Sequence, residues 1–261
     1  MDILSKIVRD KRIEINYKKE LIPIQQLEQS VLFNREPIAL SERLAQSKNG
    51  IIAEHKRRSP SKATINHSLN VYDVAKGYAS AGVCGISVLT DGKYFGGSLD
   101  DLLMARASCT LPLLRKDFTI DIYQIVEAKA FGADAILLIS AILTKEEISE
   151  FSTLAKSLGL DVLLEIHNEE ELQKSMMPTI DMIGVNNRNL KTFEVSLETS
   201  KSLSNLIPDE FIKVSESGIS NTKAIKSLQL YGYQGFLIGE NFMKTNDPGQ
   251  SATEFIKNLE S

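Results

Sequence analysis

Short apolar runs recur along the chain from residue 51 to residue 239, and segments with helical spacing separate them. Eight such runs predict strands, at Ile51–Lys56, Cys84–Thr90, Leu111–Leu114, Asp134–Ile139, Asp161–Ile166, Asp181–Asn186, Phe211–Ser215 and Gly235–Gly239. The intervening segments predict helices, at Val71–Ala81, Ile122–Phe131, Lys145–Leu158, Leu197–Leu206 and Thr222–Leu230. Because near-continuous apolar strands alternate with helices, the chain predicts a parallel sheet covered on both faces.

Eight strand–helix units of this size favour an α/β fold of the (β/α)8 TIM barrel type. A doubly wound open sheet is the alternative, but it would normally carry a glycine-rich phosphate turn after its first strand. Here that turn reads Lys-Arg-Arg-Ser-Pro-Ser. We expect one domain over residues 1–261, with an N-terminal helical extension at 1–47 and the barrel at 48–261, since no low-complexity linker separates them.

Composition bounds the class of partner. Hydrophobic residues make up 43% of the chain and charged residues 25%, and the net charge is −4, which gives no basis for binding nucleic acid or an anionic membrane. No apolar stretch has the length of a membrane span, and the first residues lack the apolar core of a signal peptide, so neither segment is expected. Cys84 and Cys109 form no CxxC pattern, so we expect reduced thiols and a cytoplasmic protein.

The three histidines have no metal-ligand spacing, so no metal is expected, and we expect neither an organic cofactor nor an obligate protein partner. The oligomeric state stays open.

The first predicted strand carries charge on one face. Side chains alternate along a strand, so Glu54 and Lys56 share a face with Ile52, while His55 points to the other face. A buried carboxylate and ammonium are costly without partners, which favours a site at this strand end. A solvated edge strand is the alternative.

Polar residues also follow the other predicted strands. They are Thr90, Asp91, Arg115, Lys116, Asp117, Glu165, Asn186, Arg188, Glu216 and Ser217. The carboxyl ends of barrel strands form the catalytic face, so these side chains are expected to converge there. Ser217-Gly218 and Gly239-Glu240 follow the last two predicted strands, where backbone N–H groups of barrels often bind phosphate, and Glu240–Lys244 could form a short extra helix there. The sequence therefore predicts a phosphorylated small-molecule substrate.

The chain resembles the indole-3-glycerol phosphate synthases over roughly residues 50–245. The matching segments, in family order, are IIAEHKRRSPSK (51–62), VLTDGKYFGGSLDDL (88–102), LPLLRKDFTIDIYQI (111–125), LLEIHNEEEL (163–172), IGVNNRNLKTF (183–193), VSESGI (214–219) and FLIGENFMK (236–244). The resemblance implies a carboxy-lyase of tryptophan biosynthesis that acts on 1-(o-carboxyphenylamino)-1-deoxyribulose 5-phosphate. That enzyme closes a ring, releases CO2 and water, and forms indole-3-glycerol phosphate.

The resemblance also implies roles for the polar residues. Lys116 matches the general acid, whose pKa a nearby Lys56 would depress, and Lys56 would hold the substrate carboxylate. Glu165 matches the dehydration base, and Glu54 would assist by orienting Lys116. The sequence leaves open whether Glu54 or Glu165 is that base and which lysine donates which proton. Further expected contacts are Asn186 with the hydroxyls, Glu216 with the sugar chain, Arg188 on the catalytic face, and Ser217, Gly218 and Gly239 with the phosphate.

Apolar residues and two departures complete the prediction. Candidates for an aryl slot are Phe95, Phe118, Ile139, Leu190 and Leu237, with core packing as the alternative for Ile139 and Leu237. His55 replaces an apolar family residue and should face the helices. Glu240 stands where some members have Ser beside the phosphate, so only its backbone N–H is expected to help.

The sequence also allows two other functions. A Schiff-base aldolase would use Lys116 as its nucleophile. A barrel that binds a phosphorylated metabolite without turnover would have little use for acid and base groups held together.

Overall fold

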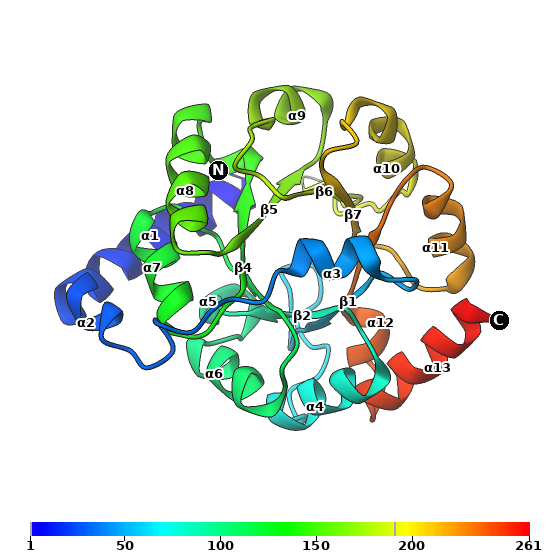
Figure 1. Cartoon of the computed structure of the whole chain (residues 1–261), viewed down its shortest axis with the longest axis horizontal. Helices are drawn as coiled ribbons and strands as arrows, with labels where there is room; N and C mark the ends of the chain where they lie inside the picture. The colour runs from blue at the N-terminus through cyan, green and yellow to red at the C-terminus, as the bar shows by residue number, and fades with distance from the viewer. Residues whose placement is uncertain (1, 191) are drawn as a thin grey trace.

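The chain folds into a closed barrel of parallel strands inside a ring of helices (Figure 1). The computed structural model describes residues 2–190 and 192–261. The strands are β1 Ile51–His55, β2 Gly85–Leu89, β3 Leu113–Lys116, β4 Ala135–Ile139, β5 Asp161–Ile166, β6 Met182–Asn186, β7 Ile212–Glu216 and β8 Gly235–Ile238. Each strand pairs with the next, and β8 pairs with β1 to close the barrel. The predicted (β/α)8 fold is therefore confirmed.

Helices cover the outside of the barrel and match most of the predicted segments. They are α4 Val71–Ala81, α5 Gly92–Phe95, α6 Leu99–Ser108, α7 Ile122–Ala130, α8 Lys145–Ser157, α9 Glu169–Ser175, α10 Glu198–Leu203, α11 Thr222–Gln229, α12 Glu240–Met243 and α13 Pro248–Glu260, with 3-10 turns η1 Ser140–Ile142 and η2 Ser204–Leu206. Side-chain caps fix several starts: the Thr144 hydroxyl accepts from the Glu147 N–H at α8, and Asn168 accepts from Glu171 at α9.

Strand β3 begins and ends two residues later than predicted. The prediction missed its end because the last two residues of the strand, Arg115 and Lys116, are charged. Arg115 points outward, where its guanidinium donates to Glu127 at 2.7 Å and to Asp117 at 3.2 Å, so a buried charge is fully paired. Lys116 points into the barrel mouth. The predicted run Leu111–Leu114 was wrong in its bounds, since apolar character alone does not mark a strand whose charged end has buried partners.

Three helices precede the barrel, and two of them close its opposite ends. They are α1 Ile3–Leu21, α2 Ile24–Glu28 and α3 Leu40–Gln46. Helix α3 crosses the front of the barrel in Figure 1, and its Leu40 and Leu44 pack against Gly85 and Gly235, the first residues of β2 and β8. Each buried leucine contributes roughly 1.5–3 kcal/mol. Helix α1 presents Ile3, Leu4 and Ile7 to the other end of the barrel.

The core has two layers that follow the alternation along each strand. Ile52 lies in the inner cluster with Leu114, Leu137 and Leu163, while Ile51 and Ala53 lie in the cluster between strands and helices. His55 is 1% exposed on that outer face, as predicted, and burial lowers its pKa to about 4, so it stays neutral.

Candidate active site

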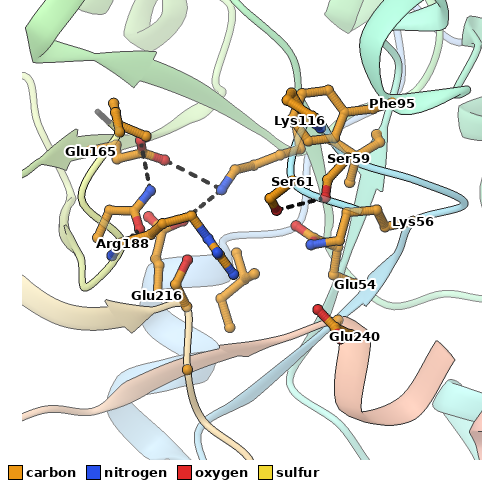
Figure 2. A pocket seen from close by; sticks show the side chains of 18 of the residues that line it. Glu54, Lys56, Ser59, Ser61, Phe95, Lys116, Glu165, Arg188, Glu216 and Glu240 are labelled. Atoms are coloured by element: carbon orange, nitrogen blue, oxygen red, sulfur yellow. Dashed lines mark hydrogen bonds and ion pairs between the residues drawn. The ribbon is translucent and has the colours of Figure 1, made fainter. Parts of the chain in front are cut away.

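A cavity of about 310 Å³ opens over the carboxyl ends of the strands. The residues with a predicted role toward the substrate line it, from Glu54 on β1 to Glu240 after β8. Also expected at this face, but not lining the cavity, are Thr90, Asp91 and Arg115. Figure 2 shows Glu165, Lys116 and Glu216 pointing toward one another from three strands. The alternation of side chains and the closure of the barrel together bring residues that are far apart in sequence to one mouth.

Lys116 stands at the centre of this cavity. Its Nζ lies 2.5 Å from Glu216 Oε2 and 3.5 Å from Glu165 Oε2. Burial by itself would lower the pKa of Lys116, but the carboxylates of Glu216, Glu165 and Glu54 raise it above its ordinary value. The predicted depression of this pKa by Lys56 is therefore wrong: three nearby carboxylates outweigh one ammonium.

Glu54 holds Lys56 rather than Lys116. Its Oε1 lies 2.8 Å from Lys56 Nζ, and its Oε2 accepts from the Ser87 hydroxyl at 3.3 Å. Burial would raise the pKa of Glu54, but Lys56 and Lys116 lower it. The carboxylate nearest the Lys116 ammonium is that of Glu216, for which the sequence predicted a sugar contact. The alternation of side chains along each strand could not show whether Glu54 or Glu216 pairs with Lys116, because the pairing depends on distances across the barrel.

Glu216 has a raised pKa. Burial, together with the carboxylates of Glu165 and Glu54, raises its pKa to about 7, although Lys116 opposes the shift. Its Oε1 is buried and lacks a hydrogen-bond partner within the described residues. Gly184 of β6 leaves the room that this carboxylate occupies, since an added Cβ there would collide with Oε1.

Asn186 and Arg188 extend the polar side of the cavity. The Asn186 amide Nδ2 donates to Glu165 Oε1 at 3.1 Å, and Asn186 Oδ1 accepts from the Arg188 N–H. The Arg188 guanidinium donates to the Phe193 carbonyl at 3.1 Å. Asn186 therefore fixes the carboxylate plane of Glu165.

At the end of the cavity near β7 and β8, the backbone turns tightly and packs closely against neighbouring residues. Ser217 and Gly218 both have positive φ, 68° and 83°, and a Cβ at Gly218 would collide with Val195. The predicted short helix after Gly239 exists as α12. Glu240 Oε1 lies 2.7 Å from Lys62 Nζ, and this lysine lowers the pKa of Glu240. The Glu240 carboxylate, which was expected to repel a phosphate, therefore pairs with the Lys62 ammonium.

Apolar side chains form the remaining wall. Phe95 and Phe118 have ring centroids 5.9 Å apart, and Ile139, Leu190 and Leu237 line the same cavity. The sequence missed Ile3, Leu4 and Ile7 of α1 and Ser59–Ser61 of the β1–α4 loop, which also line it. The sequence predicted an N-terminal helical extension, but it did not identify these α1 residues as part of the site.

A second missed contact ties α1 to the strand ends. Lys11 is 2% exposed, and its Nζ lies 2.9 Å from Asp91 Oδ2 and 3.1 Å from Asp117 Oδ1. Asp117 directly follows Lys116.

In the described residues, no group of three His, Cys, Asp or Glu side chains is arranged to hold a metal ion, and no helix is both long and apolar enough to cross a membrane.

Acid and base groups gathered over the strand ends of a closed barrel, beside an apolar wall, define a (β/α)8-barrel enzyme. The family model for indole-3-glycerol phosphate synthase matches residues 4–255. The chain therefore belongs to the indole-3-glycerol phosphate synthase family, carboxy-lyases of tryptophan biosynthesis.

Named relatives agree over nearly the whole chain. An indole-3-glycerol phosphate synthase of Bacteroides thetaiotaomicron is 48% identical over 241 residues, covering 92% of each chain. One of Paracidovorax citrulli is 43% identical, covering 92% of this chain and 93% of the relative. Among solved structures, 3-hexulose-6-phosphate synthase from Salmonella typhimurium superposes with a TM-score of 0.64 at 13% identity, covering 81% of this chain and 98% of that one, which shows the fold alone.

Proposed function

We propose that this cavity converts 1-(o-carboxyphenylamino)-1-deoxyribulose 5-phosphate to indole-3-glycerol phosphate, with Lys116 as its central acid. The observation that carries the proposal is the position of the Lys116 ammonium, 2.5 Å from Glu216 and 3.5 Å from Glu165 in a cavity with an apolar wall. In ring closure, the aryl carbon that bears the carboxylate attacks the ketone, and negative charge develops on the ketone oxygen. An ammonium beside that oxygen stabilises the charge and donates a proton.

The raised pKa of Lys116 supports this role in one respect. The residue is fully charged at neutral pH, so each turnover can begin with the proton in place. Glu216 holds the ammonium in one position, a role that the sequence did not predict for it. Preorganised charge of this kind needs no rearrangement when the oxyanion forms.

Lys56 and the apolar residues would bind the aromatic half of the substrate. The Lys56 ammonium would pair with the substrate carboxylate, and the Glu54 carboxylate would hold that ammonium in position. Phe95, Phe118, Ile139, Leu190 and Leu237 would surround the ring. Loss of CO2 then removes the negative charge that Lys56 held and restores the aromatic ring.

The phosphate would lie against the N–H groups that follow β7 and β8, at Ser217, Gly218 and Gly239, with Arg188 nearby. Glu240 would contribute its backbone N–H, while Lys62 balances its carboxylate. In the dehydration step, Glu165 would remove a proton from the carbon next to the one that loses its hydroxyl, and Lys116 would protonate the leaving hydroxyl. Asn186 would hydrogen-bond the substrate hydroxyls while it orients Glu165.

The proposal extends to location and organisation. The free thiols Cys84 and Cys109 support a cytoplasmic location, because disulfides are rare there. Contacts of the helices that precede β1 with both barrel ends support a single domain over residues 1–261.

The chain contains no tryptophan, so indole formation can be followed directly by its fluorescence. We expect wild-type protein to produce indole emission from the proposed substrate in EDTA, and Lys116→Ala to abolish it. Lys76→Ala, an exposed lysine of α4, is the matched control and should be fully active. A flat trace with wild-type protein that still binds substrate would favour a binding barrel. A borohydride-trapped adduct at Lys116 would favour the aldolase.

A further inference from the structure

His167 directly follows β5 and shares a face with Glu165. Its Nε2 lies 3.5 Å from Glu165 Oε1, and its Nδ1 lies 3.1 Å from Glu171 Oε2 on α9. Glu165 Oε2 in turn lies 3.5 Å from Lys116 Nζ. A continuous line of ionisable groups therefore leads from Lys116 through Glu165 and His167 to Glu171.

The two ring nitrogens of His167 have different surroundings. The Glu171 carboxylate accepts from the His167 backbone N–H at 2.9 Å and faces Nδ1, which fixes the hydrogen on that nitrogen. Nε2 is buried and has no hydrogen-bond partner within the described residues. A bare lone pair that faces a carboxylate is unfavourable, and a proton between Nε2 and Glu165 would satisfy both groups.

Charged groups from several elements surround this ring. Glu165 faces it from β5, Glu171 from α9 and Glu216 from β7. Burial would lower the pKa of His167, but these carboxylates raise it above its ordinary value. His167 therefore takes up a proton at a higher pH than a free imidazole does.

His167 also reaches the outside of the barrel. It lines a surface groove between α9 and α10, together with Asn168, Glu169, Glu198, Lys201 and Tyr231, and does not line the main cavity. One nitrogen thus faces Glu165 and the ring edge faces the groove, so the side chain bridges the site and solvent.

The proton balance of the proposed reaction gives this bridge a task. Lys116 gives one proton to the ketone oxygen, which becomes a hydroxyl, and a second to that hydroxyl, which leaves as water. Glu165 recovers one proton when the C–H bond breaks and its electron pair forms the ring double bond. The substrate carboxylate leaves as CO2 without a proton, so each turnover takes up one proton from solvent.

We propose that His167 relays this proton from solvent through Glu165 to Lys116. Nε2–H gives its proton to Glu165, and Glu165 passes it to Lys116. The imidazole ring then rotates so that the bare Nε2 reaches the groove and takes up a proton from solvent, and the ring returns to its place between Glu165 and Glu171. This inference rests on the proposed function, because it needs Lys116 as the acid and Glu165 as its neighbour in proton exchange.

His167→Ala and His167→Gln test the relay in the intact chain, with His67→Gln as the matched control because His67 is exposed in the β1–α4 loop. We expect both His167 variants to lose kcat by about ten- to a hundredfold. KM should stay within about twofold, because His167 does not line the main cavity. The solvent deuterium isotope effect on kcat should rise, because proton transfer becomes rate-limiting.

Imidazole provides the readout that a structural role would not move. Added imidazole should restore kcat of His167→Ala to a plateau, and substituted imidazoles should rescue according to their pKa. The alkaline fall in kcat, where His167 loses its proton, should disappear in His167→Gln and persist in His67→Gln. Wild-type kcat and isotope effect in both variants, or a loss that imidazole does not restore in a natively folded variant, would overturn the relay. If Lys116→Ala stays active, the proposed function fails instead.

Discussion

Lys116 Nζ and Glu216 Oε2 lie 2.5 Å apart, although their strands, β3 and β7, stand on opposite sides of the barrel. The ion pair therefore spans the mouth, and Gly184 of β6 makes room for the carboxylate. Glu165 shares the same ammonium at 3.5 Å. The carboxylates raise the pKa of Lys116 although burial opposes that shift, and burial together with the neighbouring carboxylates raises the pKa of Glu216 although Lys116 opposes it.

Glu216→Gln should raise the free energy of unfolding at alkaline pH and lower kcat. The pKa of Glu216, about 7, exceeds its ordinary value of 4.5, so the folded state binds this proton more tightly than the unfolded chain. Its contribution to the free energy of unfolding is therefore favourable at low pH and is lost as pH rises through about 7. We expect the variant to gain on the order of 1–3 kcal/mol at about pH 8, with little gain below pH 4.5.

The same variant should lose about a hundredfold in kcat, because Lys116 loses its closest anchor. Urea unfolding at two pH values and indole fluorescence measure the two effects. Glu254→Gln, at an exposed position of α13, is the control and should change neither quantity. A variant that is equally destabilised at both pH values would contradict the assigned charge state.

Lys11→Met should test the buried contact between α1 and the strand ends. Removal of the ammonium leaves Asp91 and Asp117 buried without their shared cation, which costs about 3–5 kcal/mol. Lys19→Met on the same helix is the matched control. Its partner Asp121 is solvent-accessible, so the cost should stay below about 1 kcal/mol. Urea unfolding followed by circular dichroism measures both, and equal costs would refute a special role for the buried pair.

Local patterns in the sequence predicted the fold and the membership of the site, but not its pairings. The alternation of side chains along β1 correctly predicted that Glu54 points into the barrel and His55 toward the helices, because this alternation is a local property of a strand. The partner of Lys116 depends on distances across a closed barrel, and Glu216 is 100 residues away in sequence. His167 could have been found, since it shares the parity of Glu165 two residues earlier. Lys11 could not, because only tertiary packing reveals its carboxylates.

Lys62→Ala should weaken substrate binding through Glu240. The Lys62 ammonium lies 2.7 Å from Glu240 and lowers its pKa, so its removal leaves a bare carboxylate at the proposed phosphate end. We expect KM to rise about three- to tenfold with little change in kcat, an effect that shrinks at high salt because both side chains are half exposed. Lys62→Ala combined with Glu240→Ser should recover most of the loss. No recovery in the double variant would mean that Lys62 acts independently of Glu240.

Gly239→Ala should disrupt the Glu54–Lys56 pair from the end of the neighbouring strand β8. A Cβ at Gly239 would lie 2.6 Å from Glu54 Oε1, closer than real side chains approach, so the carboxylate must move away from Lys56. Because Lys56 is proposed to hold the substrate carboxylate, we expect kcat/KM to fall about ten- to a hundredfold, since a displaced positioning group is costly. Gly92→Ala is the control, because its added Cβ would meet only ordinary contact at 3.5 Å. Steady-state indole fluorescence compares the two variants, and equal kcat/KM values would show that Glu54 does not position Lys56 for catalysis.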